Sequence, residues 1–296
     1  MKFNQVFKVW LLAIRPKTLG AAVAPILIGT SMAFAEGKGH FLAALTALLC
    51  ALLIQIGTNF SNDYFDFIKG ADTEERLGPV RATQAGLVTP KTMLRNFVVI
   101  FGLTIFVGIY LVLRGGWPIV IIGVLSIASG ILYTGGPSPL GYLGLGDIFV
   151  LIFFGPVAVG GTYYVQALEV SEAVIFAGLG PGLLATALLA VNNLRDEPTD
   201  KKVGKLTLAV RFGPAFVRAE YLVAFAFAVL LPFILAFWTD AHWYACISAL
   251  ITIPGYSAIR QIISRVKGQE LNDALTTTGK LIIIYSILFS LGWWIG

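Results

Sequence analysis

The sequence predicts an all-α, polytopic membrane protein, with about nine transmembrane helices in one bundle and residues 1–296 forming a single membrane-embedded domain. Three observations lead to this fold class. Hydrophobic residues make up 57% of the chain and charged residues 12%, against roughly 25% charged residues in soluble domains. The apolar residues form long continuous runs, whereas strands of a β-barrel would alternate with a period of two. Basic residues gather in alternate connections between these runs.

The runs predict the transmembrane helices in order. Each is close to or above the roughly 17 residues that a tilted helix needs to cross a ~30 Å hydrocarbon core. They cover residues 19–34, 41–61, 96–113, 118–133, 148–167, 173–191, 221–238, 242–259 and 280–295. Before the first run, Phe3, Val6, Phe7, Trp10 and Leu11 recur at helical spacing. This spacing predicts an amphipathic helix on the membrane surface.

The distribution of basic residues predicts the orientation. If the runs alternate in direction, 19 of the 21 Lys and Arg residues fall on one side, and only Lys38 and Arg114 fall on the other. The positive-inside rule then places the N-terminus in the cytoplasm and the C-terminus outside, in the cell (inner) membrane. The net charge of +5 reflects this asymmetry. No interleaved aromatic and basic face is present, so no nucleic-acid partner is expected.

Two predicted cytoplasmic loops, 67–95 and 192–219, hold most of the charge, and each follows a cluster of aspartates and asparagines. The first cluster is QIGTNFSNDYFD, in which Asp63 and Asp66 lie about 60° apart on one helix face at ~100° per residue. Asn59 and Asn62 share that face. Asp72 follows Gly70, beyond the expected helix end.

The second cluster, NNLRDEPTD, contains Asn192, Asn193, Asp196 and Asp200. Its carboxylates are four residues apart and lie about 40° apart on a helix. Carboxylates beside hydrocarbon are costly unless they are paired or bind cations, so two such clusters predict a functional site. The alternative for a single cluster is a polar helix end that pairs with loop bases. Two similar clusters on one side favour a shared site, and their spacing of four spans suggests two four-helix repeats plus one helix.

The chemistry of the clusters predicts a diphosphate site. Oxygen ligands without His or Cys favour a hard ion, which makes Mg²⁺ the expected cofactor, and Mg²⁺ is typically bound by one or two carboxylates together with substrate phosphates. The metal ligands would be Asp63, Asp66, Asp72, Asp196 and Asp200, acting largely through the diphosphate, and all of these except Asp72 are the candidate catalytic residues. The candidate diphosphate-binding residues are Asn62, Lys69, Arg76, Arg81 and Lys205.

The string NDYFDFIKGADTEERLGPVRATQAG at 62–86, with NNLRDEPTDKKVGKLTLAVRFG at 192–213, resembles the two aspartate-rich motifs of the intramembrane aromatic prenyltransferase superfamily. Within it, the first motif is similar to the branch that acts on 1,4-dihydroxy-2-naphthoate in menaquinone biosynthesis. The resemblance implies Mg²⁺-dependent transfer of a polyprenyl group from its diphosphate to this aromatic acid, with decarboxylation, to give demethylmenaquinol. The usual third aspartate of the superfamily would fall on Gly70, and Asp72 is the nearest carboxylate.

The sequence is less informative about the acceptor. The candidate pocket residues are Asn59, Asn192, Asn193, Asp147 and Tyr164, and Tyr142 is a further candidate in the same region as Asp147. For Asp147, simple helix capping is the alternative role. Two alternative functions remain: prenyl transfer to another acceptor such as 4-hydroxybenzoate, and a cation-coupled transporter. A transporter would place its charges near the bilayer midplane, whereas these clusters lie at one face.

Overall fold

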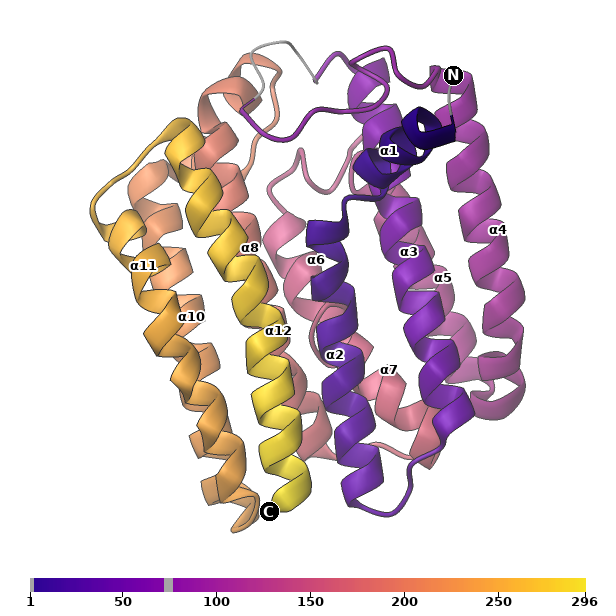
Figure 1. The fold of residues 1–296 in the computed structure, drawn as a ribbon, viewed down its shortest axis with the longest axis vertical. Helices are drawn as coiled ribbons and strands as arrows, with labels where there is room; N and C mark the ends of the chain where they lie inside the picture. Colours follow the sequence, from indigo (N-terminus) through magenta and orange to yellow (C-terminus); the bar gives the residue numbers. More distant parts are fainter. Residues whose placement is uncertain (1–2, 72–76) are drawn as a thin grey trace.

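The computed structural model describes residues 3–71 and 77–296, and within these ranges all regular structure is helical. The elements are α1 (Phe3–Ile14), α2 (Pro16–Ala35), α3 (Phe41–Ile68), α4 (Pro90–Gly115), α5 (Trp117–Leu132), α6 (Gly146–Phe153), α7 (Pro156–Ala167), α8 (Glu172–Lys202), α9 (Leu208–Phe212), α10 (Pro214–Thr239), the 3₁₀ helix η1 (Trp243–Ile251), α11 (Thr252–Ile263), η2 (Gly268–Glu270) and α12 (Leu271–Ile295). The long helices run side by side in one bundle, and the two termini lie at opposite ends of it (Figure 1). The predicted all-α fold is confirmed.

Eight helical segments in the described part of the chain are long and apolar enough to cross a membrane. They are 16–35, 41–68, 90–115, 146–167, 172–202, 214–239, 243–263 and 268–295. The predicted fourth span corresponds to α5, which is apolar but has only 16 residues. The count of nine spans and the two four-helix repeats therefore remain predictions.

Prolines set several element boundaries. Arg15 adopts a left-handed conformation (φ 55°) immediately before Pro16. Arg15 therefore separates α1 from α2. Pro156 likewise divides the predicted span 148–167 into α6 and α7, because a residue that precedes proline is disfavoured in the helical region. At this break the chain passes very close to α8: a Cβ atom at Gly178 would lie 2.7 Å from the Cα of Pro156. Only glycine permits this approach.

The prediction that residues 192–219 form a loop is wrong for most of that range. Helix α8 continues through Pro198 to Lys202, and after a short turn α9 and α10 cover most of the remainder. The apolar run ends near residue 191, but a helix does not end where its hydrophobicity ends, because Arg, Glu and Lys are good helix formers. The first predicted loop, 67–95, is closer to the structure, since α3 ends at Ile68 and α4 begins at Pro90.

The main hydrophobic core forms where α2, α7, α8, α10 and α12 meet. Helix α8 is central to it and is rich in small residues, which allow its neighbours to approach closely. A second, smaller part of the bundle is made by α3, α4 and α5. The C-terminal ends of α3 and α8 lie at the same end of the bundle, called here the aspartate end (Figure 1).

Candidate active site

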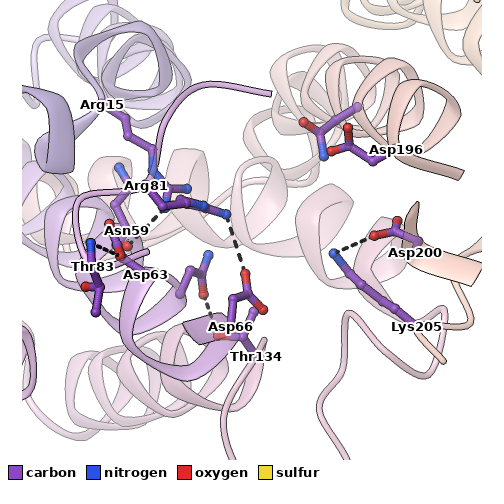
Figure 2. A network of polar contacts seen from close by, with 12 residues as sticks. Arg15, Asn59, Asp63, Asp66, Arg81, Thr83, Thr134, Asp196, Asp200 and Lys205 are labelled. Carbon is purple, nitrogen blue, oxygen red and sulfur yellow. Dashed lines mark hydrogen bonds and ion pairs between the residues drawn. The ribbon is translucent and has the colours of Figure 1, made fainter. Parts of the chain in front are cut away.

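The aspartate end brings the two predicted clusters together. Asp63 and Asp66 lie in the last turns of α3, and Asp196 and Asp200 lie in the last turns of α8. Figure 2 shows Asp63 and Asp66 on one side of a gap and Asp196 and Asp200 on the other, with the side chains of Arg81 and Lys205 pointing into it. All four aspartates are largely buried. Two helices far apart in sequence thus place four carboxylates and their basic partners around one space.

Asp63 anchors the loop that follows α3. Its two carboxylate oxygens accept backbone hydrogen bonds from Ala82 and Thr83, each at 3.0 Å. Because Arg81 precedes these two residues, the anchor fixes the position of the Arg81 side chain. Asp63 therefore has a structural task that the sequence did not reveal.

Asp66 faces the gap. Its Oδ2 atom lies 3.4 Å from Nη2 of Arg81, and its Oδ1 atom accepts a hydrogen bond from the hydroxyl of Tyr142 at 3.1 Å. Arg15, which the sequence analysis did not select, donates from Nη2 to the backbone carbonyl of Asn59 at 3.3 Å and lies beside Arg81 in Figure 2. Two guanidinium groups thus stand next to the first cluster.

The second cluster is organised by Arg195, which is 1% exposed. Its guanidinium binds both oxygens of Asp196 at 2.7 Å and also donates to the side chains of Asn192 and Asn272. Bidentate pairing of this kind fixes both groups. Arg195 was missed because its charge was attributed to membrane topology alone, although its i,i+3 spacing from Asn192 was a usable signal.

Asp200 is held more loosely. Its Oδ1 atom lies 3.6 Å from Nζ of Lys205, and its buried Oδ2 atom has no hydrogen-bond partner. The backbone N–H of Lys205 donates to the Asp200 carbonyl at 2.9 Å, so the chain turns back directly after α8. One buried carboxylate oxygen is therefore available to a ligand.

Tyr142 connects the clusters. The Nζ atoms of Lys69 and Lys205 lie 5.0 and 5.7 Å from the centre of its ring, within the range of cation–π attraction. Its backbone carbonyl accepts a hydrogen bond from the N–H of Leu206 at 3.0 Å. Lys69 also donates from Nζ to the carbonyl of Gly136 at 2.9 Å. Burial lowers the pKa of Lys69, although the nearby carboxylate of Asp66 opposes the shift.

Tyr133, which the sequence analysis did not select, follows α5 and lies near the carboxylates. Its hydroxyl can donate and accept a hydrogen bond. A usable signal was its place at the end of an apolar run, directly before the turn residues TGGP.

An apolar cavity of about 760 Å³ lies inside the bundle. Asn59, Asn62 and Tyr133 line its polar end. The rest is lined mainly by apolar side chains from α2 to α7. Because Asn62 directly precedes Asp63, the polar end of the cavity lies next to the first aspartate cluster.

The remaining predicted residues fall into four groups. Asn59 and Asn62 lie at the cavity and also have structural partners, since Asn59 donates to the carbonyl of Ile14 at 2.8 Å and Asn62 accepts from Thr134 at 2.9 Å. Asn193 and Asp147 are buried, and Oδ1 of Asp147, in the first turn of α6, has no hydrogen-bond partner. The substrate role and the capping role of Asp147 both stay predictions.

Tyr164 is not brought to the site. Its hydroxyl donates to the carbonyl of Gly115 at 3.0 Å, at the end of α4 farthest from the α3–α4 connection. The prediction rested on its aromatic side chain in the region that follows Asp147, although Tyr164 lies near the opposite end of the predicted span 148–167. Asp72 and Arg76 lie outside the described residues.

The donor set fits Mg²⁺ held jointly with a diphosphate. Among the described residues, His, Cys, Asp and Glu nowhere form a group of three that could bind an ion by themselves. Mg²⁺ commonly takes only one or two carboxylates and completes its coordination with phosphate and water. Asp66, Asp196 and Asp200 around the gap supply oxygens of this kind, one of them without a partner in the protein.

Comparison with known proteins agrees with this arrangement. Residues 22–276 match the model of the UbiA prenyltransferase family. The chain is 36% identical to the 1,4-dihydroxy-2-naphthoate octaprenyltransferase of Haemophilus influenzae over 99% of this chain and 98% of that protein. It is 44% identical to the Escherichia coli protein of the same name over 71% of this chain and 70% of that protein.

The fold is shared with a solved UbiA homologue from Archaeoglobus fulgidus bound to GPP and Mg²⁺. The TM-score is 0.67 at 16% identity, covering 96% of this chain and 99% of that one. The match to the family model covers most of the sequence, and relatives above 30% identity cover nearly all of it. The chain is a multi-pass membrane protein and belongs to the UbiA prenyltransferase family.

Proposed function

We propose that the protein transfers a polyprenyl group from its diphosphate to 1,4-dihydroxy-2-naphthoate, with loss of the carboxylate, to give demethylmenaquinol in menaquinone biosynthesis. The observation that carries this proposal is the position of the apolar cavity next to the charged gap. A prenyl diphosphate has one highly charged end and one long apolar end, and the two compartments match these ends. The acceptor is supported by the names of the relatives that align over most of the chain.

The diphosphate would be bound by the basic groups at the gap. Arg81 and Lys205 point into the gap, 3.4 and 3.6 Å from their carboxylate partners, and their charged N–H groups are suited to a phosphate. Lys69, beside Tyr142, is the third basic group. Together they stabilise charge that develops on the leaving diphosphate as the carbon–oxygen bond breaks.

Mg²⁺ would be held by Asp66, Asp196 and Asp200 and, when bound, would add further charge stabilisation on the diphosphate. The buried Arg195 keeps Asp196 in a single orientation. Asp63 acts through the loop that it anchors and thereby holds Arg81 in place.

The allylic cation that forms must be protected from water. The first carbons of the tail would lie at the polar end of the cavity, where surrounding apolar side chains exclude water. The aromatic ring must approach the same carbon. Tyr133 lines the polar end of the cavity, and Asp147 follows Gly146, which lies against the Tyr133 ring. The Tyr133 hydroxyl can donate a hydrogen bond to an acceptor oxygen and orient the ring.

The membrane orientation forms part of the proposal. The aspartate end carries most of the basic residues, so we place it and the N-terminus in the cytoplasm and the C-terminus outside, in the cell membrane. Reporter fusions at residues 85 and 205 should both report a cytoplasmic location, and a fusion at residue 115 an external one. Residues 85 and 205 on opposite sides would exclude a shared site.

The activity is tested with purified protein in nanodiscs, Mg²⁺ and geranyl diphosphate. 1,4-Dihydroxy-2-naphthoate and 4-hydroxybenzoate are supplied in separate reactions, and the products are identified by mass. We expect a decarboxylated, prenylated naphthalenediol from the first acid. A product from 4-hydroxybenzoate alone would support the alternative acceptor, and the lack of any prenylated product would refute the proposal.

A further inference from the structure

Asp147, in the first turn of α6, is a buried carboxylate that the fold leaves incompletely paired. It is 5% exposed, and its Oδ1 atom has no hydrogen-bond partner. The hydroxyl of Thr186 in α8 donates to the backbone carbonyl of Asp147 at 3.5 Å, so this contact does not involve the carboxylate. Burying a charged group without full pairing costs stability. A purely structural role therefore does not explain this side chain.

The periodicity of α6 turns Asp147 toward the apolar cavity. Val150 and Phe154 follow it at i+3 and i+7, positions that share one face of a helix, and both line the cavity. The opposite face carries Ile148 and Ile152, which are exposed. Asp147 therefore lies on the cavity-facing side of α6.

The phenol of Tyr133 is fixed beside this carboxylate. A Cβ atom at Gly146 would lie 2.9 Å from the Tyr133 hydroxyl oxygen, so the hydroxyl rests on the backbone directly before Asp147. A Cβ atom at Gly141 would lie 3.2 Å from the ring, and the N–H of Gly141 donates to the Tyr133 carbonyl at 2.9 Å. Tyr133 also lines the polar end of the cavity. A carboxylate and a hydroxyl thus lie together beside the place proposed for the reacting carbon.

The chemistry of the acceptor determines which of its groups fits here. 1,4-Dihydroxy-2-naphthoate carries one carboxylate and two hydroxyls. The charge of Asp147 repels the carboxylate of the acceptor, whereas its oxygens can accept a hydrogen bond from a hydroxyl. The pair formed by Asp147 and Tyr133 is therefore suited to a hydroxyl of the ring.

We propose that Asp147 is the catalytic base for the acceptor and that Tyr133 orients the same hydroxyl. The inference rests on the prenyl transfer proposed above and assigns residues to its aromatic half. Asp147 takes the proton of the hydroxyl next to the carbon that bears the carboxylate. The electron pair of the O–H bond forms a carbonyl, and a pair of ring electrons forms the new bond between that carbon and the allylic carbon.

The second step returns the proton. The ring carbon now carries both the prenyl group and the carboxylate, and its bond to the carboxylate breaks with release of CO₂. The electron pair of that bond restores the aromatic ring, while the carbonyl oxygen takes the proton back from Asp147. Since no proton is gained or lost overall, the base needs no path to water, which agrees with the burial of Asp147.

Asp147→Asn tests the base. Purified protein in nanodiscs is supplied with Mg²⁺, geranyl diphosphate and 1,4-dihydroxy-2-naphthoate under anaerobic conditions, from pH 6 to 9. At pH 7 we expect the rate of prenylated product to fall by about 100-fold or more. KM for geranyl diphosphate should stay within about twofold. The melting temperature should be unchanged or higher, because a neutral amide costs less to bury than a carboxylate.

The pH dependence separates a base from a structural residue. Without a base, the reaction depends on the fraction of acceptor that has already lost its hydroxyl proton in solution. The ratio of the variant rate to the unmodified rate should therefore rise by about tenfold per pH unit. The ratio is used because other groups, such as Lys69, affect both proteins alike. Asp147→Glu keeps a carboxylate and should give a constant ratio.

The matched controls alter the surroundings of Asp147 without removing its carboxylate. The ionisable side chains that interact electrostatically with Asp147 are Tyr133, after α5, and Glu220, of α10. Glu220→Gln removes the other carboxylate, and Thr186→Val removes the hydroxyl that contacts the Asp147 backbone. Both variants should show a constant ratio. Tyr133→Phe should raise KM for the acceptor by about tenfold and leave KM for the donor unchanged, since one hydrogen bond is lost.

Two results would overturn the base: an undiminished rate of Asp147→Asn at pH 7, or a diminished rate whose ratio stays constant with pH. A rising ratio in Glu220→Gln, with a constant one in Asp147→Asn, would also overturn it. An unchanged KM for the acceptor in Tyr133→Phe would overturn the orienting role. The absence of any prenylated product from the unmodified protein would instead overturn the proposed function.

Discussion

Asp63→Asn should release the loop that carries Arg81. Asp63 is 1% exposed and accepts one backbone N–H on each carboxylate oxygen. Asparagine retains one acceptor and places an NH₂ group against the other N–H. Hydrogen bonds to charged groups contribute about 1.5–3 kcal/mol, and an unpaired buried donor costs about 1–3 kcal/mol.

The expected loss for this loop is therefore about 3 kcal/mol, which corresponds to a roughly 100-fold increase in its open population. Amide hydrogen exchange at Ala82 and Thr83 reports this opening directly. We expect exchange at both amides to accelerate by about 100-fold, and KM for the prenyl diphosphate to rise because Arg81 is no longer held.

Asp66→Asn is the matched comparison. It removes a carboxylate that faces the gap but leaves the Asp63 anchor intact. It should reduce kcat strongly while exchange at Ala82 and Thr83 stays slow. If Asp63→Asn also leaves these amides protected, or if the two variants show the same exchange and kinetics, the anchoring role of Asp63 is refuted.

Four further outcomes are expected. Tyr142→Phe should lower kcat/KM by about tenfold, since it removes one hydrogen bond to a charged group, on Asp66, but keeps the ring beside the lysines; unchanged kinetics would argue against this contact. Burial lowers the pKa of Lys69, so this lysine loses its charge at a lower pH than an exposed lysine. Lys69→Arg should therefore extend activity to higher pH in a pH–rate profile, and an unshifted alkaline limb would contradict this role. Tyr164→Phe should cost about 1 kcal/mol of stability through its lost bond to Gly115, without changing kcat; a large loss of kcat would return Tyr164 to the site. Excess EDTA should abolish transfer and added Mg²⁺ should restore it, whereas full activity without divalent ions would leave the aspartates a purely structural role.

The sequence by itself determined the helical membrane class and most residues of the proposed diphosphate site. Long apolar runs have one main solution in lipid, a bundle of helices, because each helix satisfies its own backbone hydrogen bonds. Carboxylates at helical spacing beside such runs must have cations as partners, so Asp66 and Asp200 could be selected before their positions were known. Arg81 and Lys205 were selected from the basic residues that follow the clusters and from the family motifs.

Only the tertiary structure decided which partner each of these residues contacts. Asp63 and Asp66 are three residues apart on one helix face, yet one binds a loop backbone and the other faces the gap. Arg195 counts as a topological charge in the sequence and is a buried organiser of the second cluster in the structure. These differences arise because partners come from segments distant in sequence, and spacing along one helix carries no information about what packs against it.

The cavity shows the same limit. Its walls come from α2 to α7, and local sequence does not specify which side chains of these helices face a common space. Tyr164 illustrates a different error, in which a residue was selected for its side-chain type and not for its position along the helix. A helix of 12 residues spans about 18 Å, and Tyr164 lies near the end of α7, where it contacts Gly115 at the end of α4.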